Sequence, residues 1–310
     1  MLIRLSGGHV VDPVNGVDGV ADVYFEDGVI VAPPDGRAAD EDIDVSGHVV
    51  MAGAIDIHSH IAGGNVNTAR LQLPELHQAI RARLSGTPLS TAKWSTYETG
   101  RLYAQMGFTT VVEPAIAPHH ALQAHMELAD IPIIDKGGLT VLGNDDFLLH
   151  ALRAGESDDA IADYVAQTVE ATRTLGLKCI NPGGADAFKQ NMRAFGLDEI
   201  VPFYGVTSRQ IFKTLQRATA AVGIPHPLHL HMNNLGVAGN IDTALETIDA
   251  AENLPLHLAH VQFYAYGLEG KNAFSSAAPA LAARINANKN VTVDVGQVMF
   301  GDTVTVSSDV

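Results

Sequence analysis

Histidine is the residue type in this sequence whose spacing could most clearly support chemistry. The chain has 14 histidines among 310 residues, and some of them lie in pairs at the ends of apolar runs. These pairs are His58 with His60, His229 with His231, and His257 with His260. Residues i and i+2 of a strand point to the same side, so two imidazoles at the spacing of the first two pairs can bind one ion. The pairs therefore predict a metal site, and a bound metal ion can activate water and polarise a carbonyl group.

A lysine inside an apolar run adds a second kind of chemistry. Lys178 lies within residues 176–180, where a charged ammonium is costly to bury. Burial lowers the pKa of a lysine and leaves a neutral amine, which can react with CO₂ to form a carbamate. A lysine at a sheet edge or one that reaches solvent is the alternative. Because histidines end the other apolar runs, we expect a carboxylated Lys178 that bridges two metal ions.

The elements that position these residues alternate in type after about residue 50. Short apolar runs predict strands, and runs with i, i+3, i+4 apolar spacing predict helices. The expected strands are 54–57, 109–113, 131–135, 176–180, 227–232, 255–261 and 291–295, and the expected helices include 96–106, 158–175, 208–222 and 276–287. Strands that alternate with helices form parallel β/α units, so we predict an α/β fold with a (β/α)₈ barrel, and a doubly wound parallel sheet as the alternative.

The two ends of the sequence differ from this pattern. Residues 1–50 contain short apolar runs and Asp-Gly or Asn-Gly pairs without a helix signal, which predicts a small antiparallel β unit, the N-terminal part of a β-sandwich-like domain. Residues 51–310 are predicted to form the barrel. The last apolar run, 303–307, leaves no residues for a closing helix, so we expect a barrel that is incomplete at its C-terminus and a chain that is a fragment.

Composition excludes several classes of partner. There are 19 basic and 35 acidic residues, a formal charge of −16, so nucleic acid and anionic membrane surfaces are not expected partners. No apolar run reaches the ~18 residues that a membrane span needs. A single cysteine, Cys179, cannot form an internal disulfide, and we expect a cytoplasmic protein.

The sequence resembles the amidohydrolase superfamily, whose members carry a binuclear metal centre. The resemblance rests on the β-rich start, on Asp56-Ile57-His58-Ser59-His60, on the strand lysine and on the histidine-ended strands. More narrowly, four strings resemble the family of the A-type subunits of formylmethanofuran dehydrogenase. The same pattern also occurs in the alpha subunit of the methylotroph formyltransferase/hydrolase complex. The strings are HSHIAGGNVN at 58–67, GLK at 176–178 with NPGG at 181–184, and HLHMNNLG at 229–236.

The resemblance implies a specific set of metal ligands. The set is His58 and His60 on one Zn²⁺, His231 and His260 on the other, and carboxylated Lys178 between the two. His229 is the alternative to His231. It lies two residues deeper in the strand, so it can instead orient a ligand by a hydrogen bond. His226 and His257 are interpreted as packing or solvent residues. Imidazole and carbamate ligands favour Zn²⁺ without excluding Mn²⁺ or Co²⁺.

The resemblance also places the proton-shuttling group and the substrate. Superfamily members carry an aspartate at the end of the eighth strand, which we expect beyond residue 310, with Asp309 as the alternative within this chain. The candidates for holding substrate, through backbone positioning rather than catalysis, are Asn67, Arg70, Asn233 and Asn234.

The function implied is hydrolysis of an N-formyl amine of the methanofuran type, with methanofuran or methylofuran as the coenzyme, to formate and the free amine, or the reverse reaction. The expected partners are the other subunits of a formyl-transferring or formylmethanofuran dehydrogenase complex. Cyclic-amide hydrolysis of the dihydroorotase or dihydropyrimidinase kind is one alternative. A scaffold protein that binds no stoichiometric zinc is another.

Overall fold

The computed structural model describes residues 1–64, 66–68, 75 and 96–296, and the chain divides into two compact units, Met1–Ala54 and Ile55–Val310. Expected features that fall on 69–74, 76–95 and 297–310 lie outside the described residues. These features include Arg70, Asp309 and the predicted strand 303–307.

The first unit is a five-stranded mixed sheet in which β1 is central. Its strands are β1 (Leu2–Asp12), β2 (Val17–Glu26), β3 (Val29–Val31), β4 (Glu41–Asp44) and β5 (Val49–Met51). The β1–β2 and β2–β3 pairs are antiparallel, but β4 and β5 pair with β1 in parallel. The prediction of a purely antiparallel unit is wrong in these two pairs. Turn residues in the sequence indicate which strands form a local hairpin. The longer connections that lead to β4 and β5 contain no pattern that shows which strand β4 and β5 pair with.

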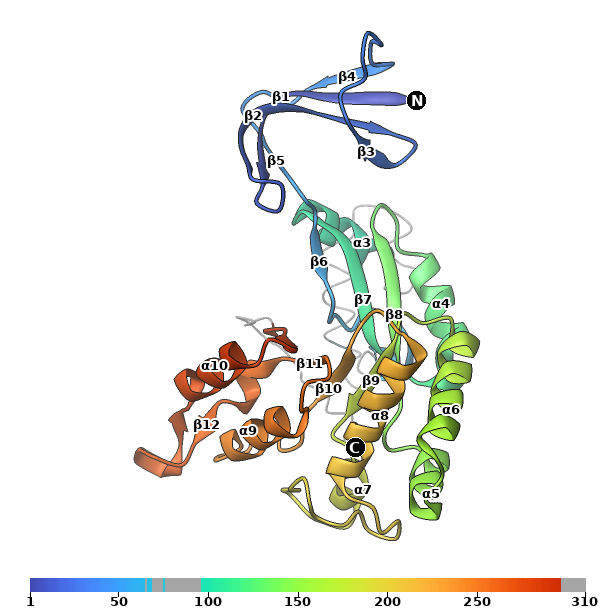
Figure 1. The fold of residues 1–310 in the computed structure, drawn as a ribbon, viewed down its shortest axis with the longest axis vertical. Helices are drawn as coiled ribbons and strands as arrows, with labels where there is room; N and C mark the ends of the chain where they lie inside the picture. The colour runs from blue at the N-terminus through green and yellow to red at the C-terminus, as the bar shows by residue number, and fades with distance from the viewer. Residues whose placement is uncertain (65, 69–74, 76–95, 297–310) are drawn as a thin grey trace. The chain divides into compact units, whose positions relative to one another are not determined.

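The second unit contains a seven-stranded sheet in the order β14-β11-β10-β9-β8-β7-β6 (Figure 1). Its strands are β6 (Ala54–Asp56), β7 (Phe108–Ile116), β8 (Asp135–Val141), β9 (Leu177–Ile180), β10 (Leu228–His231), β11 (Leu256–Leu258) and β14 (Val291–Val293). Neighbours in the sheet follow the order of the sequence, and the pairs from β7 to β14 are parallel. A doubly wound sheet reverses its strand order at one point. The sheet therefore has the curled, barrel-like α/β fold that the sequence predicts.

Helices connect these strands and cover one face of the sheet. They are α3 (Thr96–Gln105), α4 (Ala121–Ala129), α5 (Asp146–Ala154), α6 (Asp158–Thr172), α7 (Gly184–Lys189), α8 (Ser208–Val222), α9 (Ile241–Ala250) and α10 (Ala278–Ala287). The short elements are η2 (Pro118–His120), η3 (Val261–Tyr264), η4 (Lys271–Ala273), and the hairpin of β12 (Tyr266–Gly267) and β13 (Ser275–Ser276). The start and end of α8 agree with the prediction, because Thr207 and Gln210 form a capping box and Gly223 ends the helix in the left-handed conformation.

The two faces of the sheet differ in chemistry, since successive side chains of a strand alternate in direction. Leu177, Cys179, Leu228 and Leu230 are at most 1% exposed and belong to the apolar core that the helices cover. The residues between them, such as Lys178 and the strand histidines, point to the opposite face. The apolar residues of each strand therefore fix which side the polar ones occupy.

One predicted strand is misplaced. The third strand of the sheet is Asp135–Val141, not residues 131–135. Ile131 and Ile134 are buried, but in the connection after α4, where Pro132 lacks a backbone donor and Ile133 has a positive φ of 76°. Within β8, a Cβ on Gly138 would lie 2.2 Å from the Ile116 side chain, so the close packing of the two strands requires glycine at this position. A strand pattern predicts a larger apolar residue there.

No helix in the described ranges is both long and apolar enough to cross a membrane.

We predict that Leu230→Ala lowers the free energy of unfolding of the second unit by about 2–5 kcal/mol, because the leucine is 1% exposed and its removal leaves a cavity under the helix layer. Urea denaturation measures this change. Leu122→Ala is the matched control, since Leu122 is 77% exposed, and its effect should be near zero. Equal effects of the two substitutions would contradict the assignment of the core face.

Candidate metal centre

The register of the sheet aligns polar side chains from adjacent strands in one row. Lys178 on β9 is the register partner of His229 on β10, which is the partner of His257 on β11, and His257 is the partner of Thr292 on β14. Register partners on one face lie about 5 Å apart, so a row of this kind brings side chains from several strands together. Asp294 follows β14 two residues after Thr292 and therefore faces the same side.

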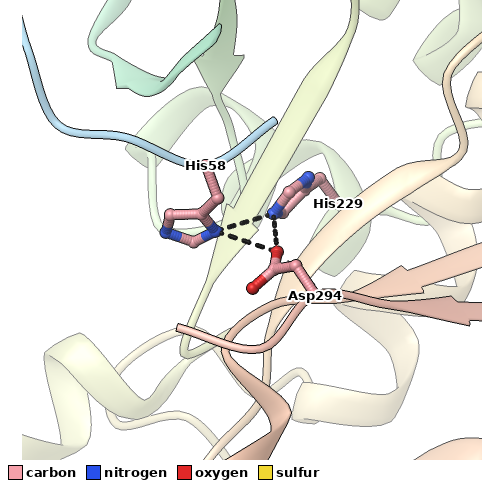
Figure 2. Close-up of side chains that lie close together, drawn as sticks. All are labelled: His58, His229 and Asp294. Atoms are coloured by element: carbon pink, nitrogen blue, oxygen red, sulfur yellow. Dashed lines mark hydrogen bonds and ion pairs between the residues drawn. The ribbon is translucent and has the colours of Figure 1, made fainter. Parts of the chain in front are cut away.

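Three ligand atoms converge at one point beside this row (Figure 2). His58 Nδ1 lies 3.0 Å from His229 Nε2 and 3.2 Å from Asp294 Oδ2, and His229 Nε2 lies 3.3 Å from the same oxygen. Tetrahedral ligands at the usual Zn–N distance of about 2.0–2.1 Å are separated by about 3.3–3.4 Å. The three atoms are thus spaced as the corners of one face of a zinc coordination sphere.

A second imidazole pair lies next to the first. His260 Nε2 is 3.1 Å from His231 Nδ1, and the rings of His58 and His260 are 5.2 Å apart between centroids. His260 follows β11 in the left-handed conformation with φ 35°, which turns the chain at the strand end. The two histidines of the 229–231 strand end thus lie in different groups, with His229 beside His58 and His231 beside His260.

Three buried polar atoms of the described residues have no hydrogen-bond partner in this region: Lys178 Nζ, His231 Nε2 and His260 Nδ1. Leaving a buried donor or acceptor unpaired costs about 1–3 kcal/mol, and more for a charged group. A site that collects several unpaired nitrogens is suited to a group that all of them contact. The residues present therefore fit a metal centre with a modified lysine.

Burial also sets the protonation of these nitrogens. It lowers the pKa of His58 to about 4 and that of His260 to about 3, and it holds the pKa values of His229 and His231 well below the usual range. The positive charge of Lys178 acts in the same direction on all four. The imidazoles are therefore neutral at pH 7, which is the form that binds metal ions.

The lysine and the aspartate respond in opposite ways. Burial lowers the pKa of Lys178 to about 7, so a large fraction of the amine is neutral at physiological pH. Burial alone would raise the pKa of Asp294, but hydrogen bonds from His229, His257 and His58 outweigh it and lower that pKa well below its usual range. Asp294 is thus a carboxylate that accepts hydrogen bonds from its surroundings.

The loop that carries His58 and His60 is held by side chains from neighbouring elements. Asp56 Oδ1 accepts the backbone N–H of His58 at 3.0 Å, and its Oδ2 accepts the Tyr103 hydroxyl at 2.9 Å. Glu127 of α4 accepts the backbone N–H of Gly63 at 2.9 Å. The Asp56 bond thus fixes the backbone from which the His58 imidazole begins, whereas Glu127 anchors the loop beyond His60.

His60 lies apart from the three-atom cluster. Its Nδ1 is 3.0 Å from Glu113 Oε1, the ring is 5.5 Å from that of His58 between centroids, and its side chain is 50% exposed. Its Nε2 is the nitrogen left for an ion.

The predicted substrate residues within the described ranges are occupied by other protein groups. Asn233 is 1% exposed, donates to the carbonyl of Pro182 and accepts from the Ser208 hydroxyl. Asn234 accepts the backbone N–H of Phe195 and donates to Thr243. The role of these two residues in holding substrate stays a prediction.

Asn67 is held in the same way, because its amide donates to Glu127 Oε1 at 2.6 Å. Each of the three asparagines therefore supports the loop that carries it.

Sequence reasoning missed four residues of this site. Asp294 lies near the end of an expected strand, 291–295, and was given no role. The pattern that identified His58, an apolar run that ends in a residue able to bind a metal, could have identified Asp294 as well. Glu113 ended another expected strand and was given no role. His257 Nε2 lies 3.1 Å from Asp294 Oδ2, and His226 Nε2 lies 3.1 Å from His229 Nδ1, so both hydrogen-bond to the site rather than merely pack around it.

Comparison with known proteins identifies the family. A family model described as "Amidohydrolase family" matches residues 41–308. The chain belongs to the amidohydrolase family. Over 315 residues it is 51% identical to the A-type subunit of the formyltransferase/hydrolase complex Fhc of Methylorubrum extorquens, and over 321 residues it is 37% identical to protein FwdA of Methanocaldococcus jannaschii. The resemblance drawn from the sequence strings is thereby confirmed.

These relatives are longer than this chain. The two alignments cover 100% and 98% of the chain but 57% and 56% of the relatives, so the chain spans little more than half of their length. A crystal structure of the formyltransferase/hydrolase complex FhcABCD from Methylorubrum extorquens with methylofuran matches with a TM-score of 0.92 at 50% identity, over 100% of this chain and 57% of that one.

More distant structures share the fold of this amidohydrolase chain. A dihydropyrimidinase from Brevibacillus agri matches with a TM-score of 0.52 at 16% identity, over 95% of this chain and 57% of that one. An N-acyl-D-glutamate deacylase from Bordetella bronchiseptica matches with a TM-score of 0.53 at 17% identity, over 94% and 58%. At these identities the likeness concerns the fold.

We predict that His229→Ala weakens Zn²⁺ binding at least about 10-fold, because it removes one of the three converging ligand atoms. Chelator competition and elemental analysis of the purified protein measure the change. His150→Ala, at an exposed histidine of α5, is the control and should bind as the unmodified protein does. Unchanged affinity in His229→Ala would exclude His229 from the site.

Proposed function

We propose that this chain carries a binuclear zinc amidohydrolase site that hydrolyses an N-formyl amine of the methanofuran type, or forms it in reverse. The observation that carries the proposal is the buried, unpartnered Nζ of Lys178 beside two groups of imidazole nitrogens. The crystallised relative in complex with methylofuran supports the choice of substrate. We infer methylofuran or methanofuran as the coenzyme that bears the formyl group.

The proposed ligands come from both imidazole groups. For one ion we propose His58 and His60 as the resemblance implies, together with His229 and Asp294. The ligand atoms of His58, His229 and Asp294 lie 3.0–3.3 Å from one another. For the other ion we propose His231 and His260. When bound, a pair of zinc ions supplies an activated water and polarises the formyl oxygen.

Lys178 is proposed to bridge the two ions as a carbamate. Its neutral amine would attack the carbon of CO₂, so that a C–N bond forms while one C=O π bond breaks and its electron pair moves to oxygen. The proton lost from the nitrogen would pass to water, and the product would be an anion with two oxygen donors. The pKa of about 7 provides the neutral amine that this reaction needs. The carbamate charge would offset part of the charge of the ions, which neutral imidazoles cannot do.

Asp294 is proposed as a ligand and hydrogen-bond acceptor rather than the proton shuttle. General bases work best with a pKa near the operating pH, whereas the hydrogen bonds of Asp294 hold its pKa far below it. His257 Nε2 at 3.1 Å and the backbone N–H of His260 at 2.5 Å keep this carboxylate in place. The proton-shuttling aspartate remains predicted beyond residue 310, as the resemblance implies.

We further propose that the protein works within a multi-subunit formyl-transferring complex, because both curated relatives match over nearly the whole chain and one of them is named as a component of such a complex. A methylotroph-type complex and a formylmethanofuran dehydrogenase are both compatible with this proposal.

The function is tested by assaying the zinc-loaded protein in its complex with formylmethylofuran and, in parallel, with dihydroorotate. We expect formate from the first substrate and no ring opening of the second. Lys178→Ala should lower kcat/KM about 100-fold or more, since it removes the bridging group. Hydrolysis of dihydroorotate alone would establish the cyclic-amide alternative, and the absence of both zinc and activity would establish a scaffold.

Carboxylation of Lys178 has its own test. Protein freed of metal and bicarbonate should bind Zn²⁺ weakly, and added bicarbonate should restore tight binding, because the carbamate completes the site. Carbon-13 NMR of the metal-loaded protein prepared with labelled bicarbonate should show a carbamate signal that Lys178→Arg lacks. Tight zinc binding without bicarbonate and without that signal would refute the modification.

A further inference from the structure

Glu113 is a buried carboxylate in the C-terminal half of β7 that none of the roles above uses. Its side chain is 1% exposed and lies against the loop that follows β6. Oε1 accepts from His60 Nδ1 at 3.0 Å and from the backbone N–H of Ala115 at 3.1 Å. Oε2 accepts the backbone N–H groups of Ile61 at 2.7 Å and Ala62 at 3.1 Å. Each oxygen therefore accepts two hydrogen bonds.

This arrangement determines which nitrogen of His60 carries a proton. The three backbone partners of Glu113 are N–H groups, so the carboxylate acts as an acceptor at every contact. An acceptor 3.0 Å from Nδ1 requires a proton on Nδ1, and a neutral imidazole has only one N–H. His60 is thereby left with a bare Nε2, whose lone pair is the one that can bind an ion.

His58 differs in this respect although it lies only two residues away. Its Nδ1 is the atom that faces His229 and Asp294, and its ring stands at 89° to that of His60. The Nδ1 atoms of the two histidines of this His-Ser-His segment therefore face different partners, other candidate ligand atoms for His58 and the Glu113 carboxylate for His60. A rotation of His60 into the orientation of His58 would break its bond to Glu113.

We propose that Glu113 is a positioning residue that holds His60 in the Nδ1–H tautomer and so assigns Nε2 as its metal-binding atom. The proposal rests on the proposed function, because it takes His60 as a ligand. Carboxylates that accept from the second nitrogen of a ligating histidine orient the ring and raise its basicity, and their loss weakens metal binding about 10–100-fold.

Glu113→Gln is the variant that tests this role with least change in shape. An amide has one acceptor oxygen and one NH₂ group, whereas both ends of the Glu113 carboxylate face two donors. If the NH₂ group faces His60, the imidazole must present a bare Nδ1 and move its proton to Nε2. If it faces Ile61 and Ala62, their N–H groups lose their acceptor, and the loop shifts and carries the His60 ring away from the amide oxygen, so the bond that fixes the proton on Nδ1 is lost as well.

Glu127→Gln is the matched control. Glu127 also accepts a backbone N–H of this loop, from Gly63, and it accepts from the side-chain amides of Asn67 and Gln123, whereas Glu113 accepts from the ring of His60. It therefore separates the anchoring of the loop from the orientation of the imidazole. Circular dichroism and thermal unfolding establish that both variants are folded.

The first measurement is zinc affinity by chelator competition, in which Glu113→Gln should bind about 10–100-fold more weakly and Glu127→Gln within about threefold of the unmodified protein. Equal affinity in Glu113→Gln, or an equal loss in Glu127→Gln, would overturn the proposal.

The second measurement is nitrogen-15 NMR of histidine-labelled, metal-free protein, with the His60 signals assigned by their loss in His60→Gln. The unmodified protein should show one His60 tautomer, protonated on Nδ1, and Glu113→Gln should lose it. A mixture of tautomers in the unmodified protein, or an unchanged tautomer in Glu113→Gln, would refute the proposal. This measurement needs no metal, so it remains informative even if the protein binds no zinc. A result that refutes the metal site can therefore be distinguished from a result that refutes the role of Glu113.

Discussion

The burial of the Lys178 side chain without a partner is the constraint on which the site depends. Its Nζ lies inside the sheet, on the face that also carries the histidines, and no group within the described ranges accepts a hydrogen bond from it. A permanent ammonium there would repel any cation that the imidazoles bind. Burial resolves this conflict by lowering the pKa, and carboxylation would convert the same residue from a repulsive neighbour into a ligand. The neutral imidazoles around it have no charge of their own with which to balance a metal ion.

The fold makes this burial possible because the strands are two-faced. Leu177 and Cys179 lie in the core beneath the helices, so Lys178 between them must point to the other side. The same alternation places His229 between Leu228 and Leu230. The register then aligns Lys178 with His229 and His257, and the strand ends add groups such as Asp294 at the next level. The helix-facing core and the face that carries Lys178 and the strand histidines thus arise from one period-two pattern.

Much of this arrangement was predictable from the sequence, for identifiable reasons. The alternation of strands with helices, the strands other than the displaced third one, and the convergence of histidine-ended strands all follow from local patterns. The contacts that could not be predicted depend on which residues pair although they lie far apart in the sequence. The partner of His58 proved to be His229, with His231 beside His260, because the choice between two residues on the same strand face depends on strand curvature and on the turn at His260. Asp294 and Glu113 were missed because a single carboxylate at a strand end is a weak signal until the neighbouring strand is known.

The central proposal is that two metal ions bind the two imidazole groups near Lys178. The most direct test is a crystal structure of the zinc-loaded protein with anomalous diffraction measured above and below the zinc edge. The account predicts two anomalous peaks about 3.5–4 Å apart, one contacting His58, His60, His229 and Asp294 and the other contacting His231 and His260. A fully loaded protein with a single peak, or with peaks away from these side chains, would contradict it.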